Sequence, residues 1–261
     1  MKKFIIFLTA ILLVTCLVTA CSSNDSKSKE NNTKKEEIRL LESITYDNGG
    51  YTKYEYDNKN RITKISEYHE SGDLGEESTL VYNGNDLVKH NLSYIIHEYE
   101  KDGNSITIRS RFKDNEDYED EYSEIDLSIN GNIISCYYKN QSGVLLDRSF
   151  QYTCDENGNL IKLNSNSGHI TIKYEYDTKN APFIHCNTPK WWMQYNSLQI
   201  KNNIIKQSEE NSDIGEDIFK HEYVYEYDDA GYPIKQTSYR DGEISDVRVY
   251  KYRSASSSND N

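Results

Sequence analysis

The chain has 261 residues, in which 43 Asp and Glu outnumber 30 Lys and Arg, so its formal net charge is −13. A surface this acidic repels phosphate backbones and anionic lipid headgroups, which excludes nucleic acid as a partner and leaves an acyl anchor as the expected membrane attachment. Only 36% of the residues are hydrophobic and 23 residues are tyrosines. The core is therefore expected to use amphipathic rings that keep one end in water.

The first 20 residues have the pattern of a secretory signal peptide. Lys2 and Lys3 precede an apolar run over residues 4–17, which is too short to span a bilayer comfortably as a helix. Residues 18–21 (VTAC) resemble the end of a bacterial lipoprotein signal. The resemblance implies that Cys21 is acylated and becomes the first mature residue, and more than one acyl chain gives stable anchoring. A plain signal peptide with a cysteine nearby is the alternative.

The predicted location is the cell envelope, with the protein held there by the lipid on Cys21. Ser22, directly after that cysteine, is compatible with sorting to the outer membrane, by resemblance to other lipoproteins, whereas the periplasmic or surface face stays open. Residues 21–37 have no apolar residue after Cys21 and are predicted to form a lipidated flexible tether. The tail over 254–261 is predicted to be disordered.

The segment 38–253 contains a repeated unit. A tyrosine-rich alternating stretch is followed by a cluster of Asn, Asp or Gly and then by Ile or Leu, as in residues 53–62 (KYEYDNKNRI) and 151–160. The anchor positions of the units fall about 17 to 30 residues apart, a spacing typical of repeat architectures. They are Tyr56, Tyr82, Tyr99, Ile129, Tyr152, Tyr176, Ile200 and Tyr227.

Each unit is predicted to be one β-hairpin. Ile170, Ile172, Tyr174 and Tyr176 share one strand face and polar residues occupy the other, while the Asn, Asp and Gly clusters permit tight reversals. A lone hairpin is marginal in water, so the units must pair side by side. The predicted fold is all-β: an antiparallel meander of about 14 to 18 strands, forming a closed barrel or a long twisted sheet. The polar face favours a soluble structure that does not span a membrane.

These units resemble the tyrosine-aspartate repeats of large bacterial shell proteins, whose motif is Tyr-x-Tyr-Asp-x-x-Gly-Arg-Leu. Residues 155–158 and 228–231 keep the spaced glycine, whereas Asn60 replaces it before Arg61 and Ile62. The chain also resembles an uncharacterised family of Gram-negative lipoproteins described as having a porin-like fold. Those proteins combine a lipoprotein signal, repeated hairpins and a late segment found here at 174–183. The resemblance covers about residues 43–253 and implies a barrel shape without an activity.

Residues 181–197 (APFIHCNTPKWWMQYNS) interrupt the repeat. Proline is poorly accommodated in a central strand, so a loop or a cap is expected here. One interpretation is a hydrophobic plug that closes an open end of the sheet. The second is a binding lip, in which Trp191, Trp192 and Tyr195 offer aromatic faces for a sugar ring and His185 lies nearby. The third is a contact for a partner protein.

The sequence contains no recognisable catalytic or metal-binding motif, so the chain is predicted not to be an enzyme and to need no metal or cofactor. The six histidines lack zinc-ligand spacing, and neither a serine nucleophile elbow nor a phosphate-binding glycine loop is present. The acidic run over 114–126 is interpreted as a solvated hairpin loop. Calcium binding is the alternative there, although the ligand spacing of a known calcium loop is missing.

Three cysteines remain in the mature chain apart from Cys21. A hairpin turn centred on residues 141–143 would place Cys136 opposite Arg148, and Cys154 would then lie roughly 20 Å further along the strand. A disulfide needs Cα atoms within about 7 Å. Cys136 and Cys154 are therefore predicted to stay unbridged, and with Cys186 the count is odd.

The predicted function is that of a non-enzymatic, lipid-anchored envelope protein that binds a glycan or a peptide on a β-hairpin scaffold. The alternative is a structural or adhesion module at the cell surface with no small-molecule ligand. A hydrolase whose site is not visible in the sequence is the third hypothesis. The exposure of Trp191 and Trp192 discriminates between the first two.

Overall fold

The computed structural model describes residues 38–113, 123–139, 144–165, 169–211 and 216–255. The signal segment with Cys21, the tether, residues 114–122 of the acidic run and residues 256–261 of the tail lie outside the described residues.

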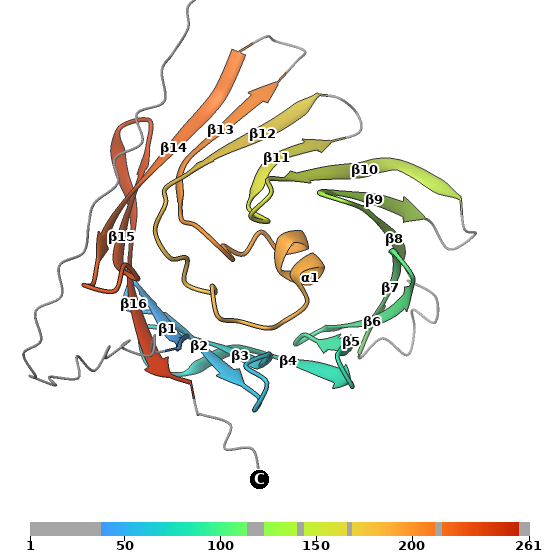
Figure 1. The fold of residues 1–261 in the computed structure, drawn as a ribbon, viewed down its shortest axis with the longest axis horizontal. Helices are drawn as coiled ribbons and strands as arrows, with labels where there is room; N and C mark the ends of the chain where they lie inside the picture. The colour runs from blue at the N-terminus through green and yellow to red at the C-terminus, as the bar shows by residue number, and fades with distance from the viewer. Residues whose placement is uncertain (1–37, 114–122, 140–143, 166–168, 212–215, 256–261) are drawn as a thin grey trace, which may run out of the picture. The chain divides into compact units, whose positions relative to one another are not determined.

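The described part of the chain forms one closed antiparallel barrel whose strands follow one another in chain order (Figure 1). The last strand pairs with the first and so closes the ring. This confirms the all-β meander and selects the barrel over the open sheet. The strands are β1 (Arg39–Tyr46), β2 (Tyr51–Tyr56), β3 (Ile62–Tyr68), β4 (Leu74–Asn83), β5 (Asp86–Asn91), β6 (Ile95–Asp102), β7 (Ser105–Phe112), β8 (Ser123–Asn130), β9 (Ile133–Lys139), β10 (Leu145–Cys154), β11 (Leu160–Ser165), β12 (Ile170–Tyr176), β13 (Ile204–Asn211), β14 (Glu216–Tyr227), β15 (Pro233–Arg240) and β16 (Glu243–Ser254).

The aspartate of the repeated unit closes a tight turn between two strands. Asp155 Oδ1 accepts the backbone N–H groups of Asn157 at 2.9 Å and Asn159 at 2.8 Å, and the Asp155 N–H donates to the Asn159 carbonyl. Gly158 has φ +89°, a conformation that costs glycine little. The same bonds recur at Asp57 and Asp228. We call the barrel end that holds these turns the Asp rim, and the opposite end, with the turns at 47–50 and 69–73, the mouth.

The tyrosines of the unit point inward and bond to backbone. The Tyr176 hydroxyl donates to the carbonyl of Leu160 at 2.6 Å, and the Tyr82 hydroxyl donates to that of Ile62 at 2.8 Å. Both carbonyls lie where a β-bulge makes the strand register irregular. Burial raises the pKa of Tyr82 to about 12. These hydroxyls therefore satisfy the backbone at bulges, and the expectation that they stay in water is wrong.

The outer face of the barrel carries cross-strand ion pairs. Lys173 lies 2.5 Å from Glu210, and Lys235 lies 2.7 Å from Glu226. Exposed pairs of this kind contribute little to stability.

The inner face changes character between the two ends of the barrel. Near the Asp rim it is apolar, with Leu41, Ile62 and Leu127 almost completely buried. Toward the mouth the inward positions become polar and include Glu67 and Glu76. No helix in the described part of the chain is long and apolar enough to cross a bilayer.

Candidate functional site

The connection between β12 and β13 runs inside the barrel (Figure 1), and we call residues 178–203 the plug. It contains α1 (Lys190–Tyr195), a short helix that the sequence did not predict, which begins directly after Pro189. Phe183, Trp192 and Met193 of the plug belong to the buried core. The segment that breaks the repeat therefore lies in the lumen, as the plug interpretation expects.

The plug is an insertion into one of the aspartate turns. Asp177 N–H donates to the carbonyl of Asn203 at 3.0 Å, and Asp177 Oδ1 accepts the Asn203 N–H at 3.0 Å. In the turn at Asp155 the same two bonds join the aspartate to Asn159, four residues further on. Asn203 thus completes a turn that Asp177 begins. Ile200, predicted as an anchor of the strand repeat, lies in the plug, because β13 begins only at Ile204.

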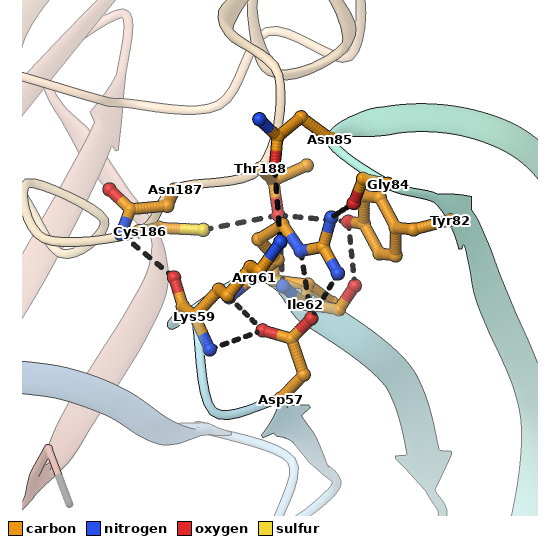
Figure 2. Close-up of polar contacts among 10 residues, drawn as sticks. All are labelled: Asp57, Lys59, Arg61, Ile62, Tyr82, Gly84, Asn85, Cys186, Asn187 and Thr188. Atoms are coloured by element: carbon orange, nitrogen blue, oxygen red, sulfur yellow. Dashed lines mark hydrogen bonds and ion pairs between the residues drawn. The ribbon is translucent and has the colours of Figure 1, made fainter. Parts of the chain in front are cut away.

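Hydrogen bonds hold the middle of the plug to the turn between β2 and β3 (Figure 2). Thr188 Oγ1 accepts the buried N–H of Ile62 at 2.9 Å. The side-chain amide of Asn187 donates to the carbonyl of Lys59 at 2.8 Å, and its backbone N–H donates to that of Asn60 at 2.9 Å. The plug is therefore joined to the wall through backbone groups that the sheet leaves available.

Arg61 organises the wall next to this contact (Figure 2). Its Nε donates to Asp57 at 2.7 Å, and its Nη1 donates to the carbonyl of Gly84 at 2.6 Å. The guanidinium lies 4.0 Å from the centre of the Tyr82 ring, a cation–π distance. The Tyr82 and Thr188 hydroxyls lie 3.3 Å apart, so the turn, the ring and the plug form one network.

The four predicted binding residues all lie in the plug, but they do not form one site. Trp192 is 2% exposed, and its indole N–H donates to the Tyr99 hydroxyl at 3.2 Å. Trp191 is half-buried and lies edge-on to the Tyr99 ring at 5.3 Å. Tyr195 is half-buried near Tyr152 on another part of the wall, where burial raises its pKa.

His185 lies apart from the two tryptophans. Its Nε2 is 2.6 Å from the hydroxyl of Tyr232, the residue directly before β15. Tyr232 also stacks under the guanidinium of Arg39, at 5.4 Å from the ring centre. The predicted grouping of His185 with the tryptophans in a lip is therefore not present in the described structure.

A cavity of about 270 Å³ lies between the plug and the wall formed by β2–β5. Trp192 and Leu198 of the plug line it, together with Ile65, Glu67 and His90 of the wall. A second cavity of about 260 Å³ lies along β2–β4 toward the mouth. Glu67 and Glu76 line both cavities, so the two are neighbours on one wall.

Glu67 and Glu76 face each other across β3 and β4. Both side chains are exposed, and neither forms a hydrogen bond or ion pair with a described residue. Like charges directly opposite each other in a sheet are destabilising. The pair is therefore expected to lower the stability of the folded barrel.

His90 and His97 face each other across the β5–β6 hairpin, with ring centres 6.2 Å apart. Burial, with a smaller contribution from His97, lowers the pKa of His90 to about 4, and burial also lowers that of His97. His97 Nδ1 lies 2.7 Å from the Ser110 hydroxyl, whereas His90 Nε2 is buried without a partner among the described residues. His90 is thus a neutral polar group inside the site that the sequence reasoning missed.

The three described cysteines are free thiols. Cys136 pairs with Phe150 in the β9–β10 register, two residues from the expected Arg148, and Cys154 lies four residues beyond Phe150. Burial raises the pKa of Cys136 to about 12 and that of Cys154 to about 11. Within the described ranges, no three His, Cys, Asp or Glu side chains gather as metal ligands would.

Comparisons with known proteins bear on the fold. The sequence matches no protein-family model and no curated protein. Among solved structures, the chain is similar to a porin-like protein from Bacteroides uniformis, with 12% identity and a TM-score of 0.50, over 82% of this chain and 96% of that chain. A porin-like protein from Bacteroides vulgatus is 12% identical with a TM-score of 0.45, over 82% and 99% of the two chains.

At 12% identity, the first of these similarities extends to the fold alone. It covers nearly the whole length of the Bacteroides uniformis chain. The role of the cavity residues therefore has to be inferred from their own chemistry.

Two features of the sequence indicate that these residues face each other in hairpins. His90 and His97 are equally distant from a turn centred on residues 93–94, and Glu67 and Glu76 from one centred on residues 71–72. Centring each hairpin on its turn residues would have paired them.

Proposed function

We propose that this chain is a lipid-anchored protein of the cell envelope whose plugged barrel binds a glycan or a peptide in the open part of its lumen. The observation that supports a ligand is the cavity between the plug and the β2–β5 wall, together with its neighbour along β2–β4. Pockets that combine apolar lining with a few polar groups are typical of ligand sites. Glu67, Glu76 and the Nε2 atom of His90 supply polar groups that form no hydrogen bond or ion pair with a described residue.

The lipid anchor is supported by residues 1–21, and the charged outer wall favours attachment through lipid over insertion of the barrel. The test is metabolic labelling of the full chain with an alkyne fatty acid. We expect label on the native protein and none on Cys21→Ser, which should also leave the membrane fraction. Equal labelling of both would contradict the anchor, and protease treatment of intact cells would assign the face.

A binding role is favoured over a catalytic one by the chemistry of the lumen. The neutral His90 has no carboxylate among its described hydrogen-bond partners, and a raised pKa keeps the thiols of Cys136 and Cys154 protonated near neutral pH. The described lining groups are thus suited to holding a ligand more than to moving a proton.

Ligand binding is tested by filling the first cavity. Ser78 lines it from β4, so Ser78→Phe should abolish binding of any glycan or peptide that the native protein retains on an array. The matched control is Thr79→Phe, because Thr79 is the next residue of the strand and faces outward. Retained binding by Ser78→Phe would contradict a site in this cavity. A native protein that retains no probe would favour the structural or adhesion module.

A further inference from the structure

The charges in the lumen are arranged differently from those on the outer wall. Outside, carboxylates are matched by lysines, as with Lys206 at 3.0 Å from Glu175 and Lys235 at 2.7 Å from Glu226. Inside, Glu67 and Glu76 stand opposite each other with no described cation to neutralise them. Arg248 also faces the lumen, but its Nε lies 2.5 Å from Asp246, which neutralises it.

Both cavities contain charged side chains of one sign only. Glutamates line them, and no lysine or arginine among the described residues does. A concave surface lined by one sign of charge attracts the opposite sign. The complementary ligand group is therefore a cation.

A second and independent observation comes from His90. Its side chain is 7% exposed, it lines the first cavity, and its Nε2 has no hydrogen-bond partner among the described residues. A buried polar atom without a partner costs free energy unless a ligand or water supplies one. Because burial keeps this imidazole neutral, one ring nitrogen can accept a hydrogen bond from a ligand N–H.

The rest of the lining includes several apolar side chains. Ile65, Leu92 and Leu198 surround the space beside the carboxylates, and the Trp192 ring closes it. Lysine and arginine side chains combine an apolar stem with a charged head that prefers water or a carboxylate. A sugar ring fits less well, because Trp192 is 2% exposed and its ring already packs edge-to-face with His90.

We propose that Glu67, Glu76 and His90 form a subsite for the lysine or arginine side chain of a basic peptide. The proposal rests on the ligand-binding function proposed above and names its ligand class. The carboxylates bind the charged head, His90 accepts one of its N–H groups, and the aliphatic stem packs against Ile65 and Leu198. Binding also removes the unfavourable pairing of two negative charges on β3 and β4.

The test is calorimetric titration of the full chain with blocked pentapeptides Gly-Gly-X-Gly-Gly, in which X is lysine, norleucine or glutamate. The blocked ends leave the side chain as the only charge. We expect binding of the lysine peptide, at least tenfold weaker binding of the norleucine peptide, and none of the glutamate peptide. Raising the salt concentration should weaken the lysine complex.

The variant Glu67→Gln/Glu76→Gln should bind the lysine peptide at least tenfold more weakly. Its thermal midpoint should be unchanged or higher, because the substitution removes a repulsive pair, so loss of binding would not reflect unfolding. The matched control is Glu100→Gln/Glu226→Gln, which removes the same charge from the outer wall. If both double variants bind equally, the attraction comes from overall charge and the subsite is wrong.

Parallel titrations with glucosamine and N-acetylglucosamine oligomers separate this inference from the proposed function. If an oligomer binds and the lysine peptide does not, the subsite is wrong and ligand binding stands. If no peptide and no oligomer binds, both are contradicted. Binding of the lysine peptide that is lost only in the lumen variant supports both.

Discussion

The indole N–H of Trp192 donates a hydrogen bond to the hydroxyl of Tyr99 across 3.2 Å, deep inside the barrel. This bond joins α1 of the plug to β6 of the wall. Tyr99→Phe should leave the indole N–H buried without a partner and lower the free energy of unfolding by about 1 to 3 kcal/mol. Urea denaturation followed by tryptophan fluorescence measures this. Tyr94→Phe is the control and should have no effect, because Tyr94 is 69% exposed.

The contact between Thr188 and Ile62 gives a second prediction. Thr188→Val keeps the shape of the side chain but removes the acceptor for a buried backbone N–H, which should cost about 1 to 3 kcal/mol. Thr188→Ser retains the hydroxyl and should cost less. Thr178→Val, at an exposed position of the plug, should leave the denaturation midpoint unchanged. Equal effects at both positions would contradict this role for the hydroxyl.

The lowered pKa of His90 makes stability depend on pH. The folded protein has a pKa of about 4 at this group, against 6.5 for the unfolded chain, so below pH 6.5 only the unfolded state takes up the proton. The free energy of unfolding should therefore fall as pH drops from 6.5 toward 4, by about 2 kcal/mol at pH 5 relative to pH 7.5. The lowered pKa of His97 acts in the same direction.

Urea denaturation of native protein and His90→Gln at pH 7.5 and pH 5 measures this contribution. The variant should lose less stability on acidification than the native protein. His69→Gln removes an imidazole at an exposed position and serves as the matched control. An unchanged pH dependence in His90→Gln would show that this imidazole is not the titrating group.

The aspartate turns give a fourth prediction. Asp155→Ala removes the acceptor of two backbone N–H groups, so it should lower the free energy of unfolding by about 1 to 2 kcal/mol. Asp155→Asn keeps a side-chain oxygen at this place and should lose less. Asp47→Ala, at an exposed turn position toward the mouth, should change stability little. Thermal unfolding of the three variants gives their midpoints. An unchanged midpoint in Asp155→Ala would contradict this role of the aspartate.

The hairpins could be predicted from the sequence because the residues of each one indicate both its strands and its turn. The alternation in β12 puts Ile172, Tyr174 and Tyr176 on one face, and the aspartate with a glycine or asparagine three residues later marks the reversal. The number of hairpins favoured closure, since closing removes the edges of a sheet of that width, but a long twisted sheet stayed the alternative. These patterns are local, so they can be recognised without knowledge of the rest of the structure.

The plug could be predicted only in part. Residues 181–197 have no period, so nothing in their sequence says on which side of the sheet they lie. The half-turn at Asn203 and Ile204 does match Asn159 and Leu160, which identifies an insertion within a turn. Whether Trp192 is a free face or a buried core residue depends on Tyr99 and His90, which come from strands about 90 to 100 residues earlier in the chain. Such long-range contacts cannot be recognised from the local sequence.

The closing seam has a practical consequence. The Ala255 N–H donates to the carbonyl of Ile38 at 2.9 Å, and neighbouring Arg39 forms an ion pair with Asp228 of an aspartate turn. The barrel segment therefore begins and finishes at the Asp rim, with neither end at the mouth. A fusion partner or an affinity handle joined through either end would leave the mouth unobstructed. Immobilising the protein through these ends presents both cavities to solution, which suits the binding measurements proposed above.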